Sequence, residues 1–173
     1  MKMMSSATSA SSHLRRDQIV NGVKVKEIVE IFETLGYECK VNSELVGASG
    51  VKHPFDIVAK RDSEMVVLDI VSLRASILDT PASDVEVTEK LQIAGIAMRA
   101  KAWDCGVYQR FIVYLSSYLA FNEGVQGSKY DPYELFLQQS NIQIVKSTDA
   151  RTAAEKLQNL LGAEERNNFS DLR

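Results

Sequence analysis

Two aspartates in neighbouring apolar segments are the first residues of this chain that could do chemistry together. Asp56 lies in "FDIVAK" and Asp69 in "EMVVLDIVS", and the turn-forming letters "RDS" separate these two β-branched runs. If a hairpin loop takes residues 61 to 64, Lys60 pairs with Met65 and Asp56 falls opposite Asp69, with β-carbons about 5 Å apart on one face. Carboxylates that close repel each other, so the spacing predicts a divalent cation between them, and Mg²⁺ is the natural candidate. The alternative is that one or both aspartates merely end strands or face solvent.

The elements that must position these aspartates follow from hydrophobic periodicity and turn residues. The pattern predicts a helix over 23–35 ended by Gly36, a strand over 37–41, a polar loop over 43–54, the strand pair, a helix over 83–103, a strand over 110–117, a helix from Asp131, a strand over 142–147 and a helix over 149–162. Strands in sequence followed by helix crossovers predict a mixed sheet, antiparallel at first and parallel later, with helices on its faces. The expected fold class is α/β, in the order α-β-β-β-α-β-α-β-α.

Length and composition favour one domain with a real core. The chain has 173 residues, of which 45% are hydrophobic and 25% charged. We expect the domain over 17–163, after a disordered leader over 1–16 and before a frayed polar tail over 164–173. The net charge of −3 gives no global positive field, so any DNA binding must come from a local patch.

The cellular setting is read from cysteines and apolar runs. Cys39 and Cys105 lack the paired spacing of a zinc site, so reduced thiols in a cytoplasmic protein are expected. No apolar run reaches the roughly 18 residues that a membrane span needs, so no membrane partner is expected.

A family resemblance rests on four segments of the chain. The helix ending "EIFETLGYECKV", the loop "GASG", and the strands "HPFDIVA" and "MVVLDIV" resemble the catalytic half of the PD-(D/E)xK nuclease superfamily, most closely archaeal Holliday-junction resolvases and Mrr-like restriction endonucleases. The match covers about residues 22 to 118. It implies a restriction-endonuclease-like sheet, with Asp56 and Asp69 as metal ligands and Ser49 in a loop that approaches the scissile phosphate.

The chain departs from this family pattern at two catalytic positions. Val71 stands where the family places a lysine that polarises the attacking water and steadies charge on the phosphate. Val25 stands where resolvases carry a glutamate, although Glu27 is nearby. Three lysines could replace the missing one. They are Lys52 in the loop, Lys60 farther along the first strand of the pair, and Lys90 on the following helix, and a solvated surface role is the competing interpretation for each.

Other residues near Asp56 suggest contacts to a phosphate. The N–H groups of Gly47 and Gly50 could meet a phosphate oxygen, although loop glycines usually serve only the turn. His53 could be a general base or an outer ligand, or simply a packed loop histidine. "MRAKAW" places Arg99 and Lys101 near Trp103, as either a basic face for DNA or an ordinary charged helix surface.

Three functional hypotheses follow from the sequence. The first is a restriction-endonuclease-like module that has lost efficient catalysis, a pseudoenzyme that binds nucleic acid or a protein. The alternative is an active Mg²⁺-dependent DNA endonuclease or Holliday-junction resolvase with a relocated lysine. The third is an assembly protein that forms a homodimer through a sheet edge or the final helix.

Overall fold

A five-stranded mixed sheet forms the centre of the chain. The computed structural model describes residues 19–20, 23–73, 84–116, 137 and 139–170, and all statements on structure concern these. The strands are β3 (Glu38–Val46), β4 (Lys52–Arg61), β5 (Glu64–Leu73), β6 (Gln109–Ser116) and β7 (Ile142–Ser147), in the spatial order β3-β4-β5-β6-β7. The first three strands are antiparallel and the last three parallel, which confirms the predicted mixed α/β sheet.

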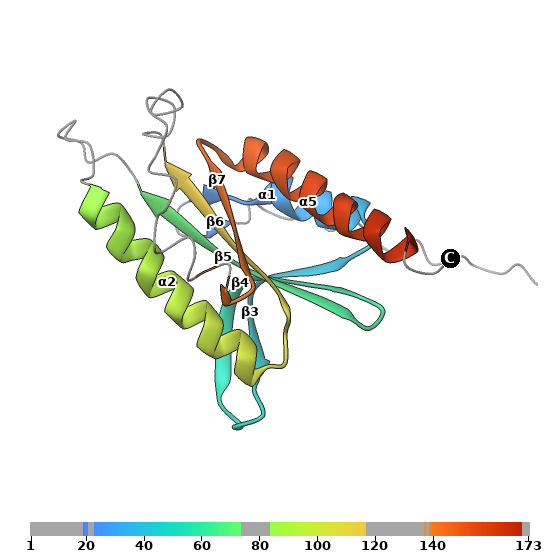
Figure 1. The fold of residues 1–173 in the computed structure, drawn as a ribbon, viewed down its shortest axis with the longest axis horizontal. Coiled ribbons are helices and arrows are strands. Elements are labelled where there is room, and N and C mark those ends of the chain that lie inside the picture. The colour runs from blue at the N-terminus through green and yellow to red at the C-terminus, as the bar shows by residue number, and fades with distance from the viewer. Residues whose placement is uncertain (1–18, 21–22, 74–83, 117–136, 138, 171–173) are drawn as a thin grey trace, which may run out of the picture.

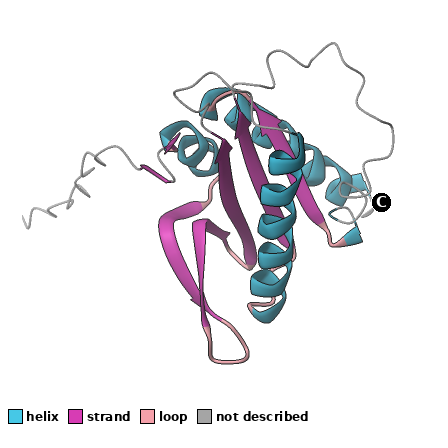
Figure 2. Ribbon diagram, turned by 90° about the vertical axis from the view of Figure 1, so that its left-hand side faces the viewer, coloured by secondary structure: helices cyan, strands magenta, loops and turns pink. Residues whose placement is uncertain are grey.

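Helices cover both faces of this sheet. Helices α1 (Lys26–Thr34) and α5 (Ala150–Ser170) lie on one face, and α2 (Asp84–Asp104) crosses the other (Figure 1, Figure 2). Two hydrophobic cores result, because strand side chains alternate between faces. Ile57 and Leu68 join the core under α1 and α5, whereas Val58 and Val67 join the core under α2.

The hairpin between β4 and β5 has the predicted register. Lys60 pairs with Met65, and the ladder also includes Arg61 opposite Glu64, so the connection is tighter than the four-residue loop expected. Asp62 in the turn has a φ of 51°, a left-handed conformation that aspartate tolerates better than most residues. This register determines which residues meet at the far end of the hairpin.

Three predicted boundaries are wrong. The loop expected over 43–54 shrinks to five residues, because β3 continues to Val46 with alternating exposure and β4 begins at Lys52. The first helix begins at Lys26, since the preceding residues form β2 (Val23–Lys24), which pairs with β1 (Ile19–Val20). The last helix does not end at Gly162 but continues to Ser170. Gly162 does not adopt the left-handed φ of a helix-ending glycine, so it costs stability without stopping the helix.

Several predictions lie outside the described residues. These are the disordered leader over 1–16, the helix start at Asp131 and the last three residues of the predicted tail. No described helix combines the length and the apolar character that a bilayer crossing requires.

Candidate active site

The two aspartates meet where β4 and β5 separate. The backbone ladder of the hairpin ends at the pair of Ile57 and Leu68. Beyond this pair, the aspartate side chains accept hydrogen bonds from the backbone of the two strands. The N–H of Asp56 donates to Asp69 Oδ1 at 3.2 Å, and the N–H of Ile70 donates to Asp56 Oδ2 at 2.6 Å. The predicted convergence of the two carboxylates is confirmed.

A lysine from helix α2 completes this group. The Nζ of Lys101 lies 2.5 Å from Asp69 Oδ2 and 2.7 Å from the backbone oxygen of Pro54. It also lies 4.6 Å from the centre of the Phe55 ring, a cation–π distance. The side chains of Lys101 and Asp69 are 17% and 16% exposed, so this ion pair is shielded from most of the solvent but still accessible.

The carboxylate of Asp56 lies in an environment that disfavours its negative charge. Burial raises the pKa of Asp56, and repulsion from Asp69 raises it further. The bond from the Ile70 N–H and the positive charge of Lys101 act in the opposite direction without cancelling the rise. A cation close to Asp56 would favour its ionised form.

An open pocket gives a ligand access to these groups. Its volume is about 660 Å³, and its walls include Ser43 and Glu44 of β3, Asp56, Asp69 and Lys101. Asn42 at its rim has a φ of 49°, which interrupts the pairing of β3 with β4 beside the site. The pocket is large enough to admit a phosphodiester group together with ordered water.

Asp56 and Asp69 are residues of this pocket that could hold a metal ion. No group of three or more histidine, cysteine, aspartate or glutamate side chains placed to hold a metal occurs in the part of the chain that the structure describes. Mg²⁺ keeps several waters and often takes only one or two carboxylates plus substrate phosphates, so two carboxylates are a ligand set compatible with it.

The lysine that contacts Asp69 is none of the three candidates that the sequence offered to replace the missing one. Val71, where the resemblance to the nuclease superfamily would place a lysine, lines the same pocket and packs against the core under α2. Lys52 and Lys60 are exposed on β4, and neither is among the pocket residues. Lys90 is exposed on α2, eleven residues before Lys101. Lys101, and not the candidate Lys90, is the lysine of this helix whose Nζ contacts Asp69.

Glu27 is also remote from the site. It lies in the first turn of α1, whose buried residues pack on the sheet face opposite α2. Val25 is fully buried in that same core. Neither Val25 nor Glu27 is among the residues that line the pocket in the described part of the chain.

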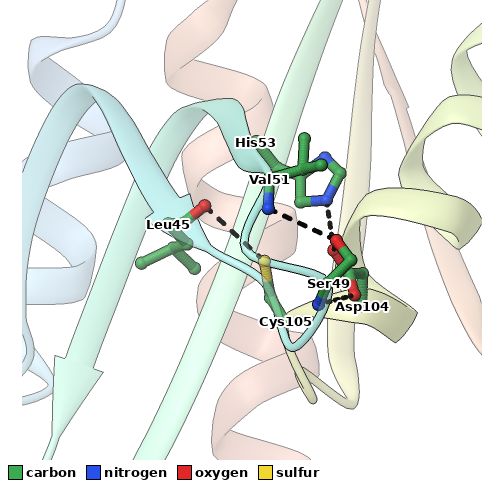
Figure 3. Close-up of polar contacts among 6 residues, drawn as sticks. All are labelled: Leu45, Ser49, Val51, His53, Asp104 and Cys105. Carbon is green, nitrogen blue, oxygen red and sulfur yellow. Dashed lines mark hydrogen bonds and ion pairs between the residues drawn. The ribbon is translucent and has the colours of Figure 1, made fainter.

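Ser49 and His53 belong to a second polar group, centred on Asp104 (Figure 3). The hydroxyl of Ser49 donates to Asp104 Oδ2 at 2.5 Å, and Nε2 of His53 lies 2.6 Å from the same oxygen. The bonds from Ser49 and His53 lower the pKa of Asp104 to about 2. Gly50 has a φ of 82° and shapes the turn.

This second group lacks the arrangement of a hydrolytic triad. In such a triad the histidine lies between serine and aspartate and accepts the serine proton. Here the carboxylate of Asp104 lies between Ser49 and His53, and a carboxylate with a pKa of about 2 is a poor base. The predicted roles of Ser49, Gly50 and His53 toward a phosphate remain predictions.

Comparisons with known proteins leave the family open. The chain matches no protein-family model and no curated protein. A solved structure described as "Crystal Structure of Protein of Unknown Function AF1548" is similar at 14% sequence identity with a TM-score of 0.46, over 76% of this chain and 63% of that one. The present chain thus spans less than two thirds of the length of that protein, and a likeness at this level carries no argument on function.

Proposed function

We propose that the chain is a Mg²⁺-dependent DNA endonuclease of the PD-(D/E)xK type whose lysine comes from helix α2. The observation that carries this proposal is the position of the Lys101 Nζ, 2.5 Å from Asp69 in the pocket that Asp69 shares with Asp56. The lysine missing at Val71 was the main reason to expect a degenerate module. Because Lys101 lies beside Asp56 and Asp69, the absence of a lysine at residue 71 no longer argues against catalysis.

Each residue has a chemical role in this proposal. Asp56 and Asp69 would hold Mg²⁺, which supplies charge neutralisation and a more acidic bound water. Lys101 presents hydrogen-bond donors and a positive charge that stabilise charge developing on the phosphate. Phe55 packs under the ammonium and limits solvent access, which strengthens these interactions.

The substrate and setting are proposed from charge and cysteine state. With a net charge of −3, binding to DNA depends on a few local cations, so affinity should be modest and strongly reduced by salt. The sequence spacing of Cys39 and Cys105 is that expected of reduced thiols, which favours the cytoplasm as the compartment. A homodimer would present two such sites to the two strands of a duplex or junction, and its mass in solution would reveal it.

Cleavage of defined substrates tests the proposal. Purified protein is incubated with plasmid, single-stranded DNA and a four-way junction in Mg²⁺, Mn²⁺ or chelator. We expect metal-dependent cutting that is lost in Asp56→Ala, Asp69→Ala and Lys101→Met and retained in Lys40→Met, which alters a lysine 66% exposed on β3. Absence of cutting of all three substrates, or cutting that survives either aspartate substitution, would contradict it.

A further inference from the structure

One carboxylate joins the end of helix α2 to the loop between β3 and β4. Asp104, the last residue of the helix, accepts bonds from the Ser49 hydroxyl at 2.5 Å and the Ser49 N–H at 2.9 Å, and its Oδ2 lies 2.6 Å from His53 Nε2 (Figure 3). Its backbone oxygen also accepts from the Ala48 N–H at 2.8 Å. The side chain and backbone of one residue thus hold two loop residues, Ala48 and Ser49, and His53 of β4.

The loop is shaped to receive this carboxylate. Gly47 is buried, and a β-carbon at this position would overlap the carboxylate of Asp104. Next along the chain, the thiol of Cys105 lies 3.9 Å from the backbone oxygen of Leu45 in β3. A bond from the Val107 N–H to the Ala102 oxygen, with Gly106 at a φ of 66°, fixes the helix end itself. We name residues 47–49, His53 and Asp104 the Asp104 clamp.

Apolar burial alone does not fix how α2 lies on the sheet. Met98 and Ala102 are fully buried, but the opposite side of the helix is also apolar, with Ile93, Ile96 and Trp103 at 69%, 54% and 76% exposure. A helix with apolar residues on both sides has no strong preference for one rotation. Polar contacts must therefore supply the register that the hydrophobic pattern leaves open.

We infer that Asp104 is a positioning residue, which through the clamp fixes helix α2 along and around its axis and so holds the Lys101 Nζ on Asp69. Lys101 precedes Asp104 by three residues, less than one helical turn, so a displacement of the clamp is transmitted to it with little attenuation. The ammonium contacts Asp69 and Pro54 only at the end of a long flexible side chain. If the helix end could shift, the ammonium would move away from both Asp69 and Pro54.

A zero-length cross-link measures this position without relying on the proposed function. A carbodiimide activates the Asp69 carboxylate, and the Lys101 amine displaces the urea leaving group to form an amide, detected by peptide mass mapping. We expect the cross-link in the wild-type protein and in Val51→Ala, a control on an exposed side chain of the same loop. Ser49→Ala removes a hydrogen bond to a charged group and should lower the yield of the cross-link about tenfold. Gly47→Ala, whose β-carbon would overlap the Asp104 carboxylate, should lower the yield as much. Ser49→Thr keeps the hydroxyl and should give the wild-type yield.

Alkylation of Cys105 reports whether the clamp has opened. In a Cys39→Ala background Cys105 is the only thiol. Burial raises the pKa of this thiol and the charge of Asp104 raises it further, and both loop substitutions keep that charge. We expect faster alkylation of Cys105 in Gly47→Ala than in Val51→Ala. An unchanged alkylation rate, or an undiminished cross-link when alkylation is faster, would overturn the inference.

Cleavage kinetics add a readout that rests on the proposed function. If the enzyme cuts DNA, Ser49→Ala should lower kcat about tenfold with little change in KM, because a displaced lysine weakens stabilisation of the transition state rather than substrate binding. A protein that does not cut DNA refutes the proposed function but leaves the cross-link test of the clamp intact. An equal loss in Ser49→Thr would contradict the role of the hydroxyl.

Discussion

Replacing Lys101 with methionine removes the ammonium but keeps an apolar stem of similar length against Phe55. The Nζ of Lys101 lies 2.5 Å from Asp69 Oδ2, and both side chains are about five-sixths buried, at 17% and 16% exposure. At the effective dielectric of about 20 near a protein surface, such an ion pair is worth roughly 6 to 7 kcal/mol before desolvation. Desolvation offsets much of this, so we expect a net loss of about 1 to 3 kcal/mol in the free energy of unfolding without metal.

Two assays measure this substitution. Thermal unfolding without metal should show a melting temperature lower by about 4 to 8 °C for a loss near 2 kcal/mol in a domain of this size. Saturating Mg²⁺ should shrink that difference, because the metal supplies the positive charge that the carboxylates have lost. Single-turnover cleavage should fall by about 10² to 10³-fold, the usual effect of removing one electrostatic contact to a transition state.

The control variant is Lys40→Met, which alters an exposed lysine. It should change the melting temperature by less than about 2 °C and leave cleavage unaltered. If Lys101→Met cuts DNA within about twofold of the wild-type rate, the electrostatic role assigned to this lysine is wrong.

Three further predictions concern charge at the two polar groups. Asp56→Asn should stabilise the metal-free protein at pH 7, since burial raises the pKa of Asp56 and the ionised carboxylate therefore costs stability. The gain in melting temperature should shrink as the pH falls toward 3.8, the ordinary pKa of an aspartate. The pKa of Asp104 is lowered from 3.8 to about 2, so its carboxylate should stabilise the native state above about pH 4 and lose this effect toward pH 2. A pH series on Asp104→Asn should show its deficit in melting temperature disappear over that window. Calorimetry should find that Lys101→Met binds Mg²⁺ at least as tightly as the wild-type protein, because a competing positive charge is gone; much weaker binding would contradict this.

Local rules were enough to predict where the two aspartates meet. Side chains alternate along strands, and the turn at "RDS" leaves few registers open, so pairing Lys60 with Met65 brings Asp56 and Asp69 together. The same rules gave the strands from β4 to β7 and the change from antiparallel to parallel pairing. They failed at β3, where polar letters in "NSEL" suggested a loop although the alternation of exposure belongs to an edge strand.

The lysine could not be found by the same rules. Lys90 and Lys101 are eleven residues apart, about three helical turns, so they lie on the same side of α2 but about 16 Å apart along its axis. A helical pattern shows which side faces the sheet but not how far along the sheet the helix lies. One signal was available: Lys101 follows Met98 by three residues and Ala94 by seven, which places a charged residue in the buried stripe.

A manganese-soaked crystal tests the central claim most directly, because Mn²⁺ replaces Mg²⁺ at oxygen sites and gives an anomalous signal. We predict one strong peak in the pocket, about 2.1 Å from a carboxylate oxygen of each of Asp56 and Asp69, that vanishes in Asp69→Asn crystals. No peak at these carboxylates at saturating Mn²⁺, or a peak that survives that substitution, would contradict the account.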